Sequence, residues 1–347
     1  MKVGIIGAGT ISANHIKGYR NNGADVAAIC DRHGDLAAAK AEQYGIPKVC
    51  TDLGELLADP DIDIISIATP VSSHTPLVLQ ALEAGKHVLC EKPPAMNEAE
   101  VEACIAARDK AKKVLQYGFV CHHDSDILWL RERYLKGEFG RVAYAEAMRI
   151  NRCINPGGWF NDKRFTKGGS LFDAAIHEID ALFFVLDYPE LASVRSFLRY
   201  ENGDLHARLG LTGKSYASAS VGEFESNVET SGTIFAVCRD GTPIVLRAAS
   251  ALCTVQECRQ FRIDGSEAGA FWDGSHDLAY IHLEKDGFRE ESVPRSDRIE
   301  LDEEMKNFLA ACRGEAPCIA TAEMARSLMR FYDAVYRSDA EGREILL

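Results

Sequence analysis

The first 120 residues alternate short apolar runs with helical patterns, and this alternation constrains the fold more than any other feature of the chain. Continuous apolar strands separated by helices predict a doubly wound, mostly parallel α/β sheet, because parallel strands are buried on both faces and need crossover helices. The expected strands are Lys2–Gly7, Val26–Cys30, Ile62–Thr69, His87–Glu91 and Val114–Phe119, and the expected helices are Ile11–Asn21, Asp35–Tyr44, Leu53–Ala58, Thr75–Ala84 and Asn97–Lys112.

Two of these helices have recognisable starts. Thr75-Pro76 places a hydroxyl cap before a proline at the first helical position, where the missing N–H costs nothing. Asn97 and Glu100 have the spacing of a capping box, in which each side chain binds the backbone of the other residue. Both signatures place a helix after an expected strand of the parallel sheet.

The pattern changes after residue 120. From about 194 to 293 the chain is mostly strand-like with period-two stretches, and Asp240-Gly241 and Asp286-Gly287 lie between such runs as hairpin signals. We therefore expect two domains, 1–120 and 121–347, the second an α+β domain built on an antiparallel sheet. Its expected helices are Asp124–Lys136, Ser170–Leu186, Ile299–Cys312 and Thr321–Ser338, and its clearest expected strands are Tyr216–Phe224, Thr233–Arg239 and Ile244–Ala249.

Charge and apolar content exclude several classes of partner. The net charge of −13 argues against nucleic acid or an anionic membrane as the main partner, because both select for basic faces. The longest apolar run, Ala181–Leu186, is too short to span a bilayer. Eleven scattered cysteines without a Cys-x-x-Cys pair are typical of buried free thiols, which predicts a reducing, cytoplasmic location. The spacing of Cys253 and Cys258 matches no common metal site, so we expect no metal.

A glycine-rich turn after the first strand predicts dinucleotide binding. Gly7 permits a tight turn and Gly9 lets the backbone approach a pyrophosphate, which then lies at a helix N-terminus, while Ser12 replaces the usual third glycine. Asp31 ends the second strand, where a carboxylate binds ribose hydroxyls and repels a 2′-phosphate; NAD is therefore favoured over NADP, although Arg32 keeps NADP open. A glycine turn without a ligand is the alternative. The expected contacts are Gly7, Gly9, Thr10, Ile11, Asp31 and Arg32.

Two further loops follow strand ends at the same expected edge of the sheet. One is Ala68–His74 and the other is Cys90–Pro94. Ligands of open α/β sheets bind beyond the carboxyl ends of the strands, so Lys92 is expected near the cofactor; the alternative is a solvated surface lysine. The loop residues expected at the cofactor are Thr69, Pro70, His74, Glu91 and Lys92.

The third motif is the segment Gly168–His177. Asp173 and His177 are four residues apart, so on a helix they share one face. Each has a structural alternative: Ser170 and Asp173 have capping-box-like spacing, and His177 can be a packed, hydrogen-bonded core histidine.

Together these motifs resemble the Gfo/Idh/MocA oxidoreductases, which include glucose–fructose oxidoreductase and inositol dehydrogenase. The resemblance covers nearly the whole chain. It rests on the glycine turn, Thr69-Pro70-x-x-x-His74, Glu91-Lys92-Pro93, the Gly168–His177 motif and the closing Thr321–Ser338 helix with its Gly342–Leu347 tail.

The resemblance implies a Rossmann domain followed by a domain with a large, open, predominantly antiparallel sheet. It also implies a nicotinamide cofactor, dimers or tetramers formed through the sheet face, and a cis peptide before Pro93. It assigns catalytic roles to Lys92, Asp173 and His177.

Alcohol oxidation needs a base whose pKa lies near the working pH, which a histidine meets. His177 is the expected general base, Lys92 the hydrogen-bond donor that stabilises alkoxide charge, and Asp173 the residue that positions substrate or base. The roles of Lys92 and His177 can be exchanged.

Several polar residues near these motifs are candidates for the substrate. Asn151, Trp159, Lys163 and Arg164 precede the catalytic helix, and Trp159 has core packing as its alternative. Where many relatives carry an arginine-containing segment, this chain has His122 and His123, which either line the pocket or have a solvated or capping role before Asp124. A metal site with His177 is disfavoured because adjacent side chains of an extended chain point apart.

The expected function is an NAD-dependent dehydrogenase that acts on a secondary hydroxyl of a sugar, inositol or related polyol. One alternative is an NAD-assisted glycosidase that works by transient oxidation and elimination. The other is a dinucleotide-sensing regulatory protein, which loss of the lysine or the histidine would favour.

Overall fold

The computed structural model describes residues 1–154, 157–200, 223–274, 276–294 and 300–347, which form two compact units. Unit 1 comprises Met1–His123 and Arg298–Met329, and unit 2 comprises Asp124–Asp297 and Arg330–Leu347. The sequence-based division assigned all of 121–347 to the second domain. The structure instead assigns Arg298–Met329 to the first unit, because a helix from this segment packs into its core.

Unit 1 is built on a six-stranded parallel sheet with the strand order β3-β2-β1-β4-β5-β6. The strands are β1 (Lys2–Ile6), β2 (Asp25–Cys30), β3 (Lys48–Cys50), β4 (Ile64–Ile67), β5 (His87–Cys90) and β6 (Leu115–Tyr117). This is the order of a doubly wound dinucleotide-binding fold, whose ligand crevice lies where the strand order reverses, between β1 and β4. The predicted doubly wound sheet is therefore confirmed.

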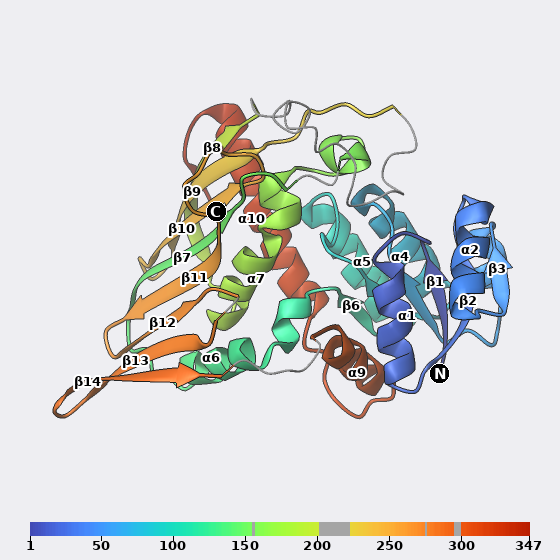
Figure 1. The fold of residues 1–347 in the computed structure, drawn as a ribbon, viewed down its shortest axis with the longest axis horizontal. Coiled ribbons are helices and arrows are strands. Elements are labelled where there is room, and N and C mark those ends of the chain that lie inside the picture. The colour runs from blue at the N-terminus through green and yellow to red at the C-terminus, as the bar shows by residue number, and fades with distance from the viewer. Residues whose placement is uncertain (155–156, 201–222, 275, 295–299) are drawn as a thin grey trace. The chain divides into compact units, whose positions relative to one another are not determined.

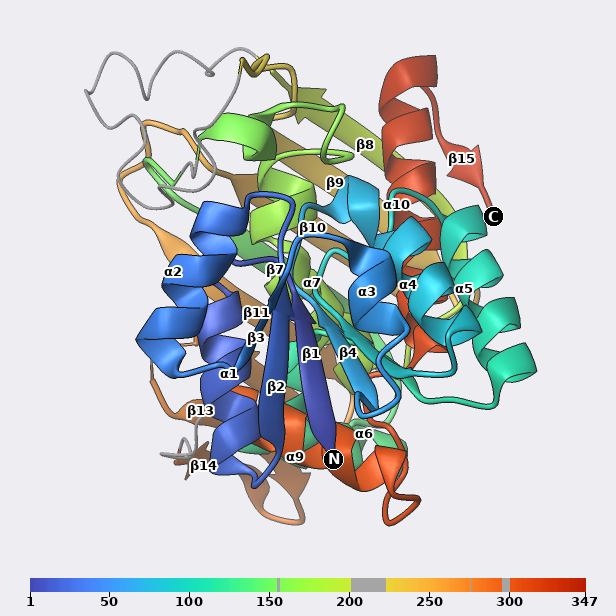
Figure 2. The ribbon, with the colours of Figure 1, turned by 90° about the vertical axis from the view of Figure 1, so that its right-hand side faces the viewer.

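Helices lie on both sides of this sheet, with α1 and α2 on one side and α4 and α5 on the other (Figure 2). The helices of unit 1 are α1 (Ser12–Asn21), α2 (Gly34–Tyr44), α3 (Leu53–Leu57), α4 (His74–Glu83), α5 (Glu98–Ala111), α9 (Glu300–Cys312) and the first part of α10 (Ala322–Glu341). Met305 and Phe308 of α9 share a buried core with Ile16 and Tyr19 of α1, which explains why α9 belongs to unit 1.

Unit 2 contains a nine-stranded sheet among the described residues, with the order β14-β13-β12-β11-β7-β10-β9-β8-β15. All neighbours pair antiparallel except β7 and β10, so the predicted antiparallel sheet is confirmed with one parallel pair. The strands are β7 (Val142–Ile150), β8 (Leu191–Arg199), β9 (Ser231–Cys238), β10 (Pro243–Ala249), β11 (Cys258–Gly265), β12 (Ala268–Trp272), β13 (Leu278–Glu284), β14 (Gly287–Val293) and β15 (Ile345–Leu346).

Helices cover one face of the nine-stranded sheet. They are α6 (Ser125–Leu135), α7 (Ile176–Val185) and the last part of α10, all on the same side in Figure 1. Along β9, Ile234 and Ala236 are buried, whereas Phe235 and Val237 are exposed, as expected for a sheet with one covered face. The predicted strand Tyr216–Phe224 lies almost entirely outside the described residues.

Three local predictions differ from the structure. The strand β3 was missed because three residues carry too little pattern. The predicted Thr75 cap is wrong: α4 begins at His74, and the Thr75 hydroxyl donates to Glu100 Oε2 at 2.8 Å instead. The predicted continuous helix Ser170–Leu186 is broken, because a π-helical turn at Ser170–Ala174 precedes α7. Half of the predicted capping box is confirmed, since Asn97 Oδ1 accepts from the Glu100 backbone N–H at 3.0 Å, whereas Glu100 Oε2 accepts from the Met96 N–H at 3.1 Å.

All eleven cysteines are free thiols, and six of them are buried, which agrees with the interpretation of the cysteine pattern. Burial raises the pKa of the Cys90 thiol well above its usual range, so it stays protonated at neutral pH. Among the described residues, no helix combines the length and the apolar content needed to span a bilayer.

Candidate functional site

The turn after β1 is shaped by Gly7. Its φ of +100° lies in the left-handed region, and a Cβ at this position would lie 2.3 Å from the Ala68 carbonyl oxygen. Only glycine fits such a turn without strain. The Gly7 N–H donates to the Cys30 carbonyl at 2.8 Å, so the turn is fixed between the ends of β2 and β4 before α1 begins.

Asp31 lies at the end of β2 and holds this turn from the side. Its Oδ2 accepts from the Ala8 N–H at 2.8 Å, and its Oδ1 accepts from the His33 N–H at 2.9 Å. The carboxylate keeps further lone pairs for a ligand, because each oxygen can accept more than one bond. Arg32 is exposed, and its Nε lies 3.3 Å from His33 Nε2. The backbone cradle and the carboxylate together fit the pyrophosphate and ribose of a dinucleotide.

His74 connects the two loops that were predicted to flank the cofactor. It is fully buried, with Nε2 2.8 Å from the Thr69 carbonyl oxygen and Nδ1 2.9 Å from the Pro93 carbonyl oxygen. Burial lowers its pKa, although both carbonyls oppose this shift. His74 therefore fixes the Thr69–Pro70 loop against the Pro93 loop, and its direct contact with a cofactor stays a prediction.

The loop after β5 carries Lys92, which is partly exposed, and the Lys92–Pro93 peptide bond is cis, as the resemblance implied. Beside it, Glu91 is buried and its Oε1 lies 2.7 Å from His15 Nε2. The other ring nitrogen of His15 lies 2.7 Å from Ser66 Oγ. Burial alone would raise the pKa of Glu91, but the bond to His15, the charge of His15 and Lys92 together lower it. Glu91 therefore remains charged next to Lys92.

A second buried carboxyl group lies in the same unit. Glu304 of α9 is fully buried, and neither of its carboxyl oxygens has a hydrogen-bond partner in the structure. Burial raises its pKa well above the usual range, and the charge of Glu91 adds to the effect. Glu304 is thus the neutral member and Glu91 the charged member of two interacting buried carboxyl groups.

In unit 2, the segment Gly168–His177 brings Asp173 and His177 to the accessible side of the π turn and α7. Both side chains are partly exposed, whereas their neighbours Phe172 and Ile176 are buried. Asp173 lies in the π turn and His177 in the first turn of α7, so the face that they share on a continuous α-helix stays a prediction. The Ser170 hydroxyl is buried and makes no hydrogen bond, so Ser170 does not cap this segment.

A buried carboxylate fixes α7 to the sheet. Glu178, next to His177, is fully buried, and its Oε1 lies 2.7 Å from Arg259 Nε on β11 and 3.3 Å from Arg149 Nη1 on β7. Arg149 and Arg259 are directly opposite each other in the β7–β11 pairing, so Glu178 offsets a like-charge pair. Arg149 Nε also donates to Asn151 Oδ1 at 3.0 Å, which fixes this candidate substrate residue at the end of β7.

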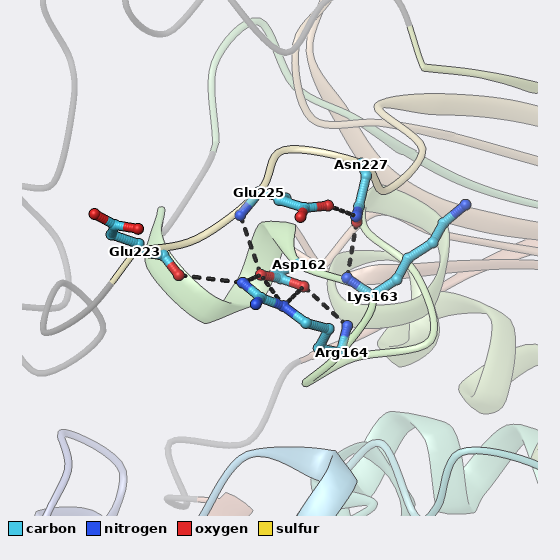
Figure 3. A network of polar contacts seen from close by, with 6 residues as sticks. All are labelled: Asp162, Lys163, Arg164, Glu223, Glu225 and Asn227. Atoms are coloured by element: carbon cyan, nitrogen blue, oxygen red, sulfur yellow. Dashed lines mark hydrogen bonds and ion pairs between the residues drawn. The ribbon is translucent and has the colours of Figure 1, made fainter.

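Figure 3 shows the network around the remaining candidates of unit 2. Asp162 is buried and accepts from the backbone N–H of Arg164 at 2.9 Å and from its guanidinium, which hold the pKa of Asp162 well below its usual range. Asp162 also accepts from the Glu225 N–H at 3.0 Å, and Asn227 accepts from the Lys163 N–H at 2.8 Å. Arg164 is thus committed to an internal ion pair, and its role toward a substrate stays a prediction.

Trp159, His122 and His123 occupy short turns. The Trp159 ring stacks on Phe160 with ring centroids 3.7 Å apart and is partly exposed. His122 is fully buried, 5.2 Å from the Phe119 ring between centroids, and His123 is also buried, so neither is solvated. Burial, and then the neighbouring His122, lower the pKa of His123 to about 3, so it is neutral at physiological pH. Among the described residues, no cluster of potential metal ligands is found.

Sequence reasoning missed His15, Glu178 and Glu304. A polar residue inside an otherwise apolar helix face was the available signal, as for Glu178 within Ile176–Val185. The pairing of His15 with Glu91 carries no such local signal, because the two residues are 76 positions apart.

Comparisons with known proteins agree on one family. A model described as an oxidoreductase family with an NAD-binding Rossmann fold, GFO_IDH_MocA, matches residues 1–119, and the GFO/IDH/MocA C-terminal domain model matches residues 127–271. D-glucoside 3-dehydrogenase of Escherichia coli (strain K12) is 32% identical over 100% of this chain and 97% of its own length. Inositol 2-dehydrogenase of Salmonella paratyphi B is 29% identical over 54% of this chain and 55% of its own length.

The fold matches solved structures as well. An oxidoreductase domain protein from Kribbella flavida superimposes with a TM-score of 0.86 over 99% of this chain and 98% of that chain, at 21% identity. This likeness concerns the fold of the chain.

Proposed function

Because this chain belongs to the GFO/IDH/MocA family of NAD-binding oxidoreductases that act on CH–OH groups, we propose that it oxidises a secondary hydroxyl of a sugar, an inositol or a related polyol. The full-length similarity to D-glucoside 3-dehydrogenase carries this proposal, since it spans both units. A D-glucoside is therefore the first substrate to test, and myo-inositol the second.

NAD is the proposed cofactor, and it supplies the hydride acceptor when bound. The backbone from Gly7 to Ile11 would receive the pyrophosphate at the start of α1, because the N–H groups of a helix N-terminus favour a bound phosphate. Asp31 would accept hydrogen bonds from the ribose hydroxyls, and its charge would repel the 2′-phosphate of NADP. The loops held by His74 would complete the site.

The choice of NAD over NADP is tested with Asp31→Asn. Asparagine keeps one acceptor oxygen and a similar shape but removes the negative charge. We expect the ratio of the NADPH to the NADH dissociation constant to fall about tenfold, equivalent to about 1.4 kcal/mol. Fluorescence titration with both cofactors measures it, with the exposed Asp35→Asn as the control. A wild-type protein that binds NADPH more tightly than NADH would contradict the choice.

In the proposed chemistry, His177 takes the proton from the substrate hydroxyl and Lys92 donates a hydrogen bond to the same oxygen. Asp173 orients the substrate or the base. A partly exposed imidazole suits proton transfer because its pKa starts near neutrality, and a cationic lysine stabilises developing negative charge. The two roles are exchangeable. Asn151, Trp159, His122 and Arg164 are the proposed substrate contacts.

These roles are tested by a panel of D-glucosides, inositols and free sugars with NAD, followed by the absorbance of NADH. On the best substrate, Lys92→Ala and His177→Ala are expected to lower kcat by about 10²-fold or more and to leave NADH binding nearly unchanged. The exposed Lys285→Ala and His276→Ala are the matched controls. Unchanged turnover in both active-site variants would refute the assignments.

The same panel separates the two alternatives. Release of the aglycone from a glucoside without net NADH would identify an NAD-assisted glycosidase. Tight NADH binding without turnover of any compound would favour a dinucleotide-sensing protein.

A further inference from the structure

Glu229 lies directly behind the backbone of the segment that carries Asp173 and His177. It is fully buried, just before β9, and its Oε1 accepts from two N–H groups of that segment: the Gly169 N–H at 2.8 Å and the Leu171 N–H at 3.0 Å. The Glu229 backbone adds a third bond, because its carbonyl oxygen accepts from the Ser170 N–H at 3.1 Å. One residue therefore binds three successive N–H groups at the start of the π turn.

The two glycines of the motif fit this arrangement. A Cβ on Gly169 would lie 2.3 Å from the Glu229 carbonyl oxygen, and a Cβ on Gly168 would lie 2.7 Å from Glu229 Oε2 and 1.7 Å from the Tyr336 hydroxyl oxygen. Only a backbone without side chains can approach Glu229 so closely. The Gly-Gly pair is thus explained by packing against Glu229 and Tyr336, with no need for a ligand.

Burial and hydrogen bonding act in opposite directions on the pKa of Glu229. Burial raises its pKa, and the N–H donors of Gly169 and Leu171, together with Tyr336, only partly oppose this shift. A carboxyl oxygen accepts from backbone N–H groups in either protonation state, so what the segment requires is an acceptor of this length at this place. Glutamine meets that requirement, whereas methionine has a similar length but supplies no comparable acceptor.

We propose that Glu229 is a positioning residue that sets the orientation of Asp173 and His177 by fixing the N–H groups of Gly169, Ser170 and Leu171. The inference rests on the proposed function, because it assigns catalytic roles to Asp173 and His177. Small displacements of reacting groups lower turnover steeply, so loosening this anchor acts on kcat rather than on cofactor binding, which belongs to the glycine turn of unit 1.

The kinetic test compares Glu229→Met with Glu229→Gln. Glu229→Met is expected to lower kcat about 10²-fold and to leave the KM for the substrate and the Kd for NADH within threefold. Glu229→Gln is expected to restore kcat to within a few-fold of the wild type. Asp126→Leu is the matched control, since Asp126 is buried in the same unit and likewise accepts two N–H bonds, from Trp272 Nε1 and from Ile127. The Asp126→Leu variant should lose stability without a comparable loss of kcat.

Hydrogen exchange separates this proposal from the proposed function. In Glu229→Met, the amides of Gly169 and Leu171 should exchange much faster than in the wild type, whereas in Asp126→Leu their protection should persist. If the wild type oxidises no polyol but this exchange pattern holds, the anchor stands and the assigned chemistry fails. If exchange at Gly169 and Leu171 is unchanged, or if Glu229→Gln loses as much kcat as Glu229→Met, the anchoring role is overturned.

Discussion

At the scale of single residues, the molecule stabilises buried charges with specific partners. Glu91 is charged and bound to His15, Asp162 is charged and bound to Arg164, and Glu178 lies between two arginines. Such groups are costly in a low-dielectric interior unless each lone pair finds a donor. Each of these three carboxylates adjoins a predicted site segment. The partner lies far away in the sequence for Glu91 and Glu178, and across a turn for Asp162.

The pair of His15 and Glu91 makes a testable contribution to stability. The pKa of Glu91 is depressed in the folded protein, so its stabilisation is present above the pKa of the unfolded chain and is lost as the pH falls through the folded value. His15→Gln removes the main partner and leaves burial dominant. We expect a loss of about 1–3 kcal/mol in the free energy of unfolding at pH 7, shrinking below about pH 4.

Urea denaturation at a series of pH values measures this difference, with the exposed His33→Gln as the control. An equal loss for His15→Gln at pH 7 and at pH 3.5 would contradict the assigned charge of Glu91.

At the scale of elements, the segment before α7 depends on close contact between backbones. Gly168 is buried, and Gly169 N–H and Ser170 N–H are both bound by Glu229. The π turn that follows contains Asp173 and leads into α7, which carries His177, whereas the sequence predicted one continuous α-helix through both. The backbone conformation differs from the predicted α-helix at the π turn. We attribute this difference to Glu229, which binds the Gly169 N–H from 60 positions away.

Gly169→Ala tests how rigid this contact is. The added Cβ would lie 2.3 Å from the Glu229 carbonyl oxygen, which is backbone and cannot rotate away. Either the chain before β9 or the Gly168–His177 segment must shift, and overpacking of this kind costs about 1–3 kcal/mol. We expect that loss in thermal or urea unfolding, together with a fall in kcat. The control is Gly54→Ala in α3, whose Cβ would meet only the Asp52 side chain at 3.3 Å and which should be nearly neutral. An equally small effect of Gly169→Ala would show that the backbone contact with Glu229 is not rigid.

At the scale of the whole molecule, local sequence patterns predicted most helices and strands. The packing of α9 and the position of Glu229 depend on contacts between residues far apart in the sequence. The alternation of apolar runs predicted the parallel sheet, because β1, β4, β5 and β6 are buried along almost their whole length. The three-residue β3 and the packing of α9 into unit 1 were missed, since neither has a periodic signal of its own. The glycine turn and Asp31 were predictable because their spacing is set by one strand–turn–helix unit. Glu229 was not, because its role exists only once β9 meets the Gly168 segment.

The remaining whole-molecule expectation is assembly into dimers or tetramers through the sheet of unit 2. The face of that sheet opposite α6 and α7 exposes large apolar side chains, including Phe197 on β8, Phe235 on β9 and Phe271 on β12. Large apolar side chains exposed on one face of a sheet are typical of an interface between subunits. The expected assembly into dimers or tetramers can therefore be tested by changing residues on this face of the sheet.

Phe235→Glu places a charge on that face and should reduce the mass measured by size-exclusion chromatography with light scattering to that of a single chain. Burying an unpaired carboxylate between subunits costs several kcal/mol, enough to dissociate an interface of ordinary affinity. Leu135→Glu, an equally exposed apolar position at the end of α6, is the control and should leave the mass unchanged. A wild-type protein that is already monomeric, or a Phe235→Glu variant that keeps the full oligomeric mass, would exclude this face as the site of assembly.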